Sequence, residues 1–371
     1  MATDYKTYAA GIMPLGLAYF LLFALWLSAG IIEQPVSYNM IITSTLLIII
    51  GSHRSLALLE TGEDGKRLVE VDSISTDDAK KFPLVASVSL FGLGLAFKYF
   101  DKDTVNFCLS IYIGAAGIFT LVGTISPIIS LFHKFEEKFF MKLKTPFIGE
   151  SNIDYTWGDI IALILSGIFC YFYFTTKHFM LNNIFGISFC IQGIEKISIG
   201  SYTNGAILLG GLFFYDIFWV FGTDVMVTVA KSFDGPIKLL FPRSLETMFM
   251  PNPPCSLLGL GDIVIPGFFI ALLLRFDSFR AKVDPKVAAN VSFSKPYFTT
   301  NIISYASGLI TTVLVMYFFE AAQPALLYLV PFTLIASSLT AYFTGTWDEL
   351  MDYNELELDN EEEEGEDKKQ K

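Results

Sequence analysis

Two aspartates lie inside long apolar stretches of the sequence. Asp216 follows Tyr215 in the apolar run 205–222, and Asp262 lies 46 residues further along, in the apolar run 256–274. Runs of this length and composition predict membrane-spanning helices. An ionised carboxyl at the centre of such a span costs about 2.5–3.5 kcal/mol or more, so it is retained for a partner or a function. A hydrogen bond between helices would explain one such residue, whereas two on consecutive spans favour a functional role.

The two carboxyls are expected at the same depth in the membrane. If the two spans are antiparallel neighbours, Asp216 and Asp262 each lie six residues from the same membrane face, or about 9 Å at 1.5 Å per residue. Facing carboxyls in a low-dielectric site do not easily both ionise, so one keeps its proton and the pair titrates as a unit. One carboxylate can then take a proton from water while the other group polarises a scissile carbonyl. The pattern predicts an aspartic-protease dyad.

Two glycines just before Asp262 suit a peptide substrate. Gly259 and Gly261, on either side of Leu260, each weaken a helix by about 1 kcal/mol and leave the backbone approachable. Exposed backbone beside the carboxyl could hydrogen-bond an unwound substrate segment as an added β-strand. Close helix packing through small residues is the structural alternative.

A third short motif opens the last predicted span, at the same membrane face as the aspartates. It consists of Gln323, Pro324, Ala325 and Leu326. Proline is ordinary at the first turn of a helix. Taken by itself, the motif therefore indicates only a helix start.

The composition is that of a membrane protein. Of the 371 residues, 53% are hydrophobic and only 17% are charged, against roughly 25% charged in an ordinary soluble domain. A cleaved signal peptide is the alternative for residues 12–32, but Asp4 and a single Lys6 make a poor basic start, and the apolar run is too long. We expect an all-α, polytopic membrane protein, a helical bundle of nine to ten spans. The candidate spans are 12–32, 38–52, 83–97, 105–131, 157–175, 179–194, 205–222, 256–274, 300–320 and 323–343.

Lysine and arginine counts predict the orientation. The connections on one side of the membrane carry 18 of these residues, and those on the other side carry six. The richer side is normally the cytosolic one. The loop 53–81 and the C-terminus are therefore predicted to be cytosolic, and the loop 223–255 lumenal.

The acidic charge is concentrated at the C-terminus. Residues 348–371 carry twelve Asp and Glu and three Lys, which accounts for most of the net charge of −12. This composition predicts disorder.

Lys368 and Lys369 resemble the di-lysine retrieval signal of endoplasmic-reticulum membrane proteins, with simple charge balance as the alternative. The chain then divides into an N-terminal segment with an extra span (1–37), a multi-span protease region (38–345) and a disordered cytosolic tail (346–371).

Other chemistries fit the sequence less well. A rhomboid-type serine protease needs an intramembrane serine with a histidine, and no histidine lies mid-span. A zinc protease needs HExxH, which the sequence lacks, so no metal or other cofactor is expected, and no basic cluster indicates nucleic acid. The main alternative is a proton-coupled transporter or channel that uses the two aspartates as a relay. Against it, the other ionisable residues near the spans lie at predicted span ends: Glu195, Lys196, Asp224, Arg275 and Glu320.

Together, the three motifs resemble those of a known family. Tyr215-Asp216, Gly259-Leu260-Gly261-Asp262 and Pro324-Ala325-Leu326 match the YD, GxGD and PAL motifs of the presenilin-type intramembrane aspartyl proteases, and the surrounding sequence is similar to the signal peptide peptidases of that family. The resemblance covers roughly residues 38–343 and implies a presenilin-like fold, usually with nine spans. It implies Asp216 and Asp262 as catalytic groups. The substrate-binding residues that it implies are Tyr215, Gly259, Leu260, Gly261, Gln323, Pro324, Ala325 and Leu326.

The resemblance also implies a substrate class and a location. Such a protease hydrolyses peptide bonds within transmembrane segments, chiefly remnant signal peptides and some type II or tail-anchored membrane proteins, with a water activated by the two aspartates. It acts in the endoplasmic-reticulum membrane, with transmembrane peptides and the lipid bilayer as its partners. Homo-oligomers and endoplasmic-reticulum quality-control complexes are further assemblies that the resemblance leaves open.

Overall fold

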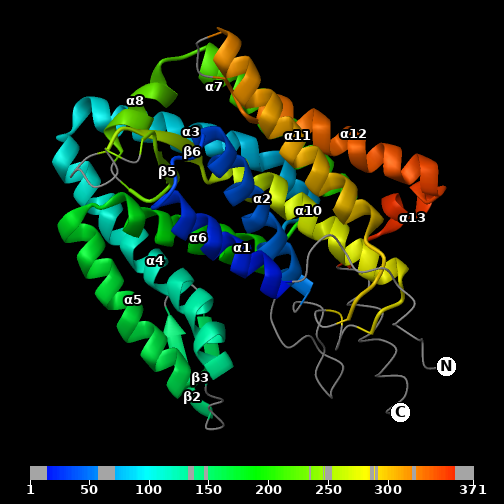
Figure 1. The fold of residues 1–371 in the computed structure, drawn as a ribbon, viewed down its shortest axis with the longest axis horizontal. Helices are drawn as coiled ribbons and strands as arrows, with labels where there is room; N and C mark the ends of the chain where they lie inside the picture. Colours follow the sequence, from blue (N-terminus) through cyan, green and yellow to red (C-terminus); the bar gives the residue numbers. More distant parts are fainter. Residues whose placement is uncertain are drawn as a thin grey trace.

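The computed structural model describes residues 15–56, 72–132, 138–145, 149–233, 235–244, 246, 253–284, 288, 291–319 and 323–355. Most of these residues form the helices of a single bundle (Figure 1). The helices are α1 (Leu15–Ala29), α2 (Val36–Ser55), α3 (Thr76–Tyr99), α4 (Lys102–Phe132), α5 (Trp157–Thr176), α6 (Phe179–Lys196), α7 (Tyr202–Phe221), α8 (Val225–Ser232), α10 (Gly261–Arg280), α11 (Pro296–Phe319), α12 (Leu326–Thr344) and α13 (Trp347–Asp352).

Seven of the described helices are long and apolar enough to cross a membrane, namely α2, α3, α4, α5, α7, α11 and α12. Helix α1 is apolar but only 15 residues long. Helix α10 has 20 residues, among them Asp262, Arg275, Asp277 and Arg280, and is not one of the seven. The chain is thus mostly helical and polytopic, and the finer count of nine to ten spans stays a prediction.

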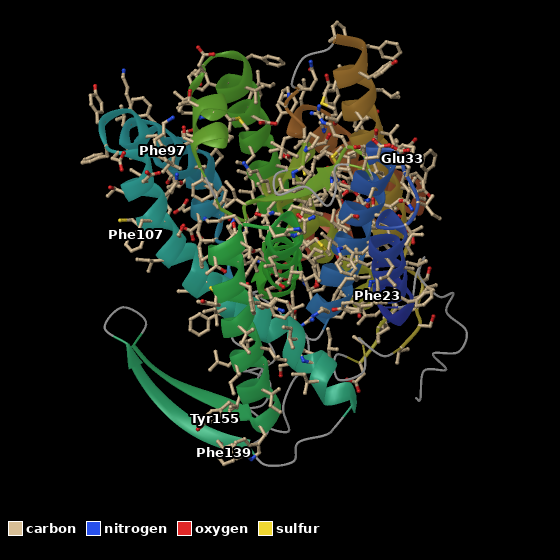
Figure 2. All side chains as sticks on the ribbon, turned by 60° about the vertical axis from the view of Figure 1, so that its left-hand side comes forward. Phe23, Glu33, Phe97, Phe107, Phe139 and Tyr155 are labelled. Atoms are coloured by element: carbon tan, nitrogen blue, oxygen red, sulfur yellow. The ribbon has the colours of Figure 1, made fainter. Side chains whose placement is uncertain are left out.

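The outer surface of the bundle is apolar. Large hydrophobic side chains are exposed along α3, α4, α5, α7, α11 and α12. Phe107 of α4, for example, points away from the bundle and is 67% exposed (Figure 2). Soluble proteins rarely expose contiguous apolar surface on this scale. A surface of this kind is suited to contact with lipid chains.

Helix α10 lies at the centre of the bundle. It packs against α2, α6, α7, α11 and α12, and its residues from Pro266 to Ser278 are all buried. Glycines allow the close approach to α6: a Cβ on Gly51 of α2 or on Gly267 of α10 would come within 2.7 Å or 2.5 Å of Ile194. Small residues at helix contacts are the usual means of tight packing in membranes. The middle of the helix that carries Asp262 is therefore enclosed by protein, and this enclosed part includes Arg275 and Asp277.

Three two-stranded sheets interrupt the expected all-α fold. The strands are β1 (Asp72–Ser73), β2 (Lys138–Thr145), β3 (Gly149–Thr156), β4 (Ile197–Ser198), β5 (Lys238–Pro242) and β6 (Cys255–Gly259). They pair as β1 with β4 in parallel, and as β2 with β3 and β5 with β6 in antiparallel order. In the β2–β3 hairpin, Phe139 stacks on Tyr155 (Figure 2). The β5–β6 sheet matters most for function, because β6 leads directly to Asp262.

The predicted start of the C-terminal tail is wrong. Residues 347–352 form α13, and Glu355 is 2% exposed. The Glu355 carboxylate accepts a 2.7 Å hydrogen bond from Nε of Arg275 and another from the Ser198 hydroxyl. The buried partner in α10, far away in sequence, is what orders this acidic segment. Residues 356–371, with Lys368 and Lys369, lie outside the described residues.

Arg275 also differs from its predicted place at a span end. It lies more than one turn before the end of α10 and is 1% exposed. Its Nη1 donates a 2.9 Å hydrogen bond to Ser55 at the end of α2. Nearby, Lys295 Nζ lies 3.1 Å from His53 Nε2. Burial lowers the pKa of the Lys295 ammonium from its ordinary value, and the neighbouring Asp277 carboxylate opposes that shift.

Candidate active site

Asp216 lies on the inward face of α7. The buried residues Leu212, Asp216 and Trp219 follow one another at helical spacing, and Asp216 is only 5% exposed. On the opposite face, Phe214 and Phe218 are exposed. This division matches an amphipathic helix whose apolar side faces lipid, with the carboxyl turned into the bundle.

The Asp216 carboxylate is bound to the start of α12. The backbone N–H of Leu326, the first residue of α12, donates a 3.0 Å hydrogen bond to Asp216 Oδ2. The N-cap residue of that helix is Ala325, which has no side chain that could accept such a bond. The first N–H groups of a helix have no partner within it, and they favour a negative charge. Asp216 therefore caps α12 from another helix, and this joins the Tyr215-Asp216 motif to the Pro324-Ala325-Leu326 motif.

Asp262 lies where a strand changes into a helix, so the predicted span 256–274 is wrong at its start. Residues 255–259 form β6, the N–H of Leu260 donates to the carbonyl of Ile237, and α10 begins at Gly261. Asp262 is consequently in the first turn of α10, not six residues inside the span. Pro253 and Pro254 precede β6 and disfavour a helix there.

Gly259 is the glycine that matters sterically at this site. A Cβ at position 259 would lie 3.2 Å from Asp262 Oδ2, tighter than most real contacts. At Gly261 the nearest atom would be 3.7 Å away, an ordinary distance. The missing side chain at 259 therefore keeps the approach to the Asp262 carboxyl open, whereas Gly261 is not required for space.

The structure brings most of the predicted motif residues together. Helix α10, which carries Asp262, packs against both α7, which carries Asp216, and α12. Gly259 is beside Asp262, and Leu326 is bound to Asp216. Tyr215 instead packs toward Trp219, with ring centroids 6.3 Å apart. The remaining motif residues lie in the chain next to these contacts, at positions 260, 261 and 323–325.

Sequence reasoning missed Tyr305 of α11. Its hydroxyl donates a 3.3 Å hydrogen bond to the backbone carbonyl of Asp262, and the side chain is fully buried. The bond holds the first turn of α10 against α11. A lone tyrosine in an apolar span carries no local signal, so only the three-dimensional contact identifies it.

Comparison with known proteins establishes the family. Residues 66–357 match the model of a family described as signal peptide peptidase. The chain belongs to the signal peptide peptidase family. It is 40% identical to the signal peptide peptidase of Homo sapiens, over 85% of this chain and 82% of that protein. Intramembrane protease 2 of Caenorhabditis elegans is 33% identical, over 86% of this chain and 90% of that protein.

The relatives agree on the class of activity. A probable intramembrane protease of Schizosaccharomyces pombe is a further relative, 38% identical over 71% of this chain and 77% of that protein. The chain is accordingly an enzyme, an intramembrane protease, and a multi-pass membrane protein. The alternative of a proton-coupled transporter or channel is not favoured.

Proposed function

We propose that Asp216 and Asp262 are the catalytic pair of this protease and that they act as one unit. The carboxylate of the pair takes a proton from a water molecule while the protonated group polarises the scissile carbonyl. The observation that carries the proposal is the hydrogen bond from Leu326 N–H to Asp216. This bond joins the Tyr215-Asp216 motif to the Pro324-Ala325-Leu326 motif through the Asp216 carboxylate. In the third motif, Gly259 lies beside the Asp262 carboxyl.

The substrate is proposed to be a transmembrane peptide, chiefly a remnant signal peptide, with some type II or tail-anchored membrane proteins. A relative bears the name signal peptide peptidase, which supports the first of these. A helical substrate must unwind before its backbone can react, and it then needs hydrogen-bond partners. In the described part of the chain, β6 pairs only with β5. The other edge of β6, which ends at Gly259, is therefore the proposed place for an added substrate strand.

The proposed setting is the endoplasmic-reticulum membrane, with nine or ten spans and a cytosolic C-terminus. Lysine and arginine counts of 18 against six support this orientation. The contacts agree with this orientation. Arg54 at the end of α2 pairs with Glu195 at the end of α6, so these two helix ends lie on the same side of the bundle. Arg275, toward the end of α10, pairs with Glu355 of the C-terminal segment. The region 38–345 would form the protease unit. A single cysteine in the loop 223–255 that reacts only from the cytosolic side would overturn the orientation.

The proposal is tested with the purified protein in lipid nanodiscs and a synthetic signal-peptide segment. Mass spectrometry should find products cut inside the apolar region of the segment. Activity should follow a bell-shaped pH profile, since one carboxyl must be ionised and the other protonated. Inhibitors of serine and metal proteases should have no effect. Cleavage outside the apolar region, or loss of activity with a metal chelator, would contradict the mechanism.

A further inference from the structure

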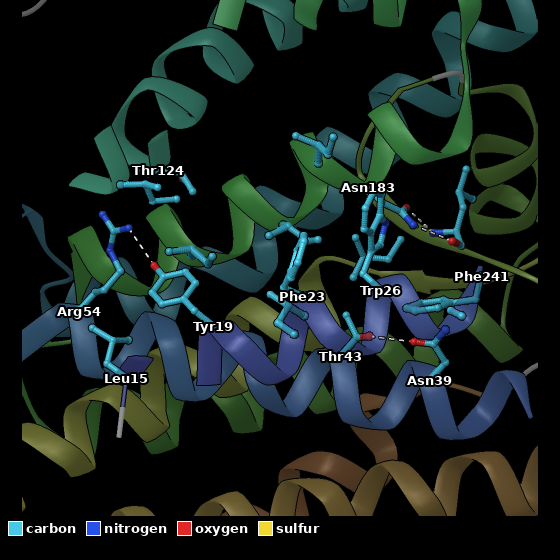
Figure 3. Close-up of a pocket in the computed structure, with 18 of the residues that line it drawn as sticks. Leu15, Tyr19, Phe23, Trp26, Asn39, Thr43, Arg54, Thr124, Asn183 and Phe241 are labelled. Atoms are coloured by element: carbon cyan, nitrogen blue, oxygen red, sulfur yellow. Dashed lines mark hydrogen bonds between the residues drawn. The ribbon is translucent and has the colours of Figure 1, made fainter. Parts of the chain in front are cut away.

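A cavity lies in the bundle, apart from the two aspartates. Its volume is about 1040 Å³, and no residue of the three motifs lines it. It lies between α1, α2, α4 and α6, and β5 closes one end (Figure 3). The match to the family model begins at residue 66, so it leaves out α1 and α2. Two of the helices that line the cavity therefore lie outside the residues that match the family model.

The cavity is lined mainly by apolar groups. Tyr19, Phe23 and Trp26 follow one another along α1 and project into it (Figure 3). Ile184 and Ile187 of α6 belong to the wall on the other side. Lining residues on α1 extend from Leu15 to Ala29, a length of about 21 Å at 1.5 Å per residue. The hydrocarbon core of one leaflet is about 15 Å thick, half of roughly 30 Å, so the cavity has room for an extended chain.

The polar residues that line the cavity are already engaged within the protein. Arg54 pairs with Glu195 and donates to the hydroxyl of Tyr19. Asn183 binds the backbone of Leu240, accepting from its N–H and donating to its carbonyl. The other polar lining residues take part in hydrogen bonds as well, namely Asn39, Thr43, His53 and Thr124. The two charged lining residues are thus paired with each other, and an occupant needs no charge.

These properties select hydrocarbon as the occupant. A water molecule is held in a cavity only by two to four polar partners, and most polar groups here are engaged with other groups of the protein. The cavity lies next to the outer surface of the bundle, because Phe23 of its lining is 57% exposed and Phe20 of the same helix is 64% exposed. In a membrane, the hydrocarbon next to such a site is the acyl chain of a phospholipid. We propose that this cavity is an acyl-chain site that holds one phospholipid of the bilayer.

The site is connected to the candidate active site through β5. Leu239, Leu240, Phe241 and Pro242 of this strand line one end of the cavity. The strand pairs with β6 over its whole length, and β6 ends at Gly259 beside Asp262. A chain in the cavity supports β5 on the side away from β6. Occupancy should therefore favour the paired strands and, with them, the open approach to the carboxyl.

Photolabelling tests the proposal directly. The full-length protein is placed in nanodiscs of phosphatidylcholine that contains a trace of a diazirine-bearing acyl-chain analogue, and labelled peptides are found by mass spectrometry. Label is expected on cavity residues of α1 and α6. Ile187→Trp fills the centre of the cavity, and Gly16→Leu fills its end, where a Cβ meets no atom within 4 Å. Each should reduce the label on Ile184 and Ile191 at least fivefold.

Phe20→Trp is the matched control, because it changes the lipid-facing side of α1 and not the cavity. It should leave the labelling of Ile184 and Ile191 unchanged. The melting temperature shows whether Ile187→Trp is folded. If it is not, Gly16→Leu provides the test in its place. Equal labelling of these residues in wild type and in folded filling variants would overturn the proposal. So would loss of the label from these residues when a sterol or a signal peptide is added while the ratio of labelled to unlabelled phosphatidylcholine is kept constant.

Discussion

The two ends of α10 hold charged groups in different ways. Toward its C-terminal end, Arg275 has fixed partners: Glu355, Ser55 and Ser198 all bind its guanidinium, and the ion pair is buried. At the N-terminal end, Asp262 lies on a helix that packs against α7 with its Asp216, a group of the same charge when ionised, and Gly259 leaves space beside the Asp262 carboxyl. One end holds Arg275 in a buried ion pair, and the other carries the acid that we propose acts together with Asp216.

The two ends of α10 therefore have different roles: the Arg275 end serves stability, and the Asp262 end serves the chemical reaction. A buried ion pair such as Arg275–Glu355 contributes to the structure only as a complete set, because removing one partner leaves a buried charge. Two neighbouring carboxyls, by contrast, stabilise nothing when both are ionised, but they can share and transfer a proton. We therefore expect substitutions at the Arg275 end to affect stability first, and substitutions at the Asp262 end to affect activity first.

The largest effect on stability should come from Glu355→Ala. This change leaves the Arg275 guanidinium buried without its carboxylate, a cost of about 3–5 kcal/mol. The melting temperature in detergent should fall strongly. Glu349→Ala is the matched control, because Glu349 forms an exposed pair with Arg280, and exposed pairs contribute about 0–1 kcal/mol. Equal melting temperatures for the two variants would show that the C-terminal segment is not part of the packed fold.

Pro324→Leu should lose about 100-fold in activity, a loss typical of a catalytic group misplaced by about 1 Å, while the protein still inserts and accumulates. Without the proline, α12 can begin earlier, and the N–H of Leu326 can enter the hydrogen-bond ladder of that helix instead of binding Asp216. Pro331→Leu, inside the same helix, should keep its activity. Full activity of the Pro324→Leu variant would reduce the motif to an ordinary helix start.

A smaller effect is expected from Gly259→Ala. The added methyl group comes 3.2 Å from Asp262 Oδ2, and displacing the carboxyl from its working position should cost about tenfold in kcat/KM. Gly210→Ala on α7 is the control, since a Cβ there meets nothing within 4 Å. Both variants should melt close to the wild type. If they also cleave equally, the approach to Asp262 does not depend on this glycine.

Tyr305→Phe should give the smallest change. It removes one hydroxyl and its hydrogen bond to the Asp262 carbonyl, a net contribution of about 0.5–1.5 kcal/mol. Because Tyr305 acts by positioning the first turn of α10, kcat should fall about threefold while KM stays the same. Tyr317→Phe, at an exposed position on the same helix, serves as the control. A change in KM alone would mean that Tyr305 contacts the substrate instead.

Features of the fold and the site that depend on neighbouring residues in the sequence could be predicted. Features that depend on contacts between residues far apart in the sequence could not. The polytopic helical character of the chain and the position of Asp216 within an apolar helix follow from local apolar runs, and the sequence predicted both. The strand β6 was missed because its hydrogen-bond partners lie in β5, so a local pattern of apolar residues and glycines looked helical. Glu355 was assigned to a disordered tail because its own neighbourhood is acidic. Its partner Arg275 is 80 residues away, and no local pattern reports that contact.

The most direct test of the central claim is the rate of signal-peptide cleavage by Asp216→Asn, Asp262→Asn and the double variant, each at matched expression. Asparagine keeps the size of the side chain but cannot exchange the proton. If the two groups act as one unit, each single variant should lose at least about a thousandfold in rate, and the double variant should lose little more. All three should melt near the wild type, unlike Glu355→Ala. Substantial cleavage by either single variant would contradict the claim that these two carboxyls carry the chemistry.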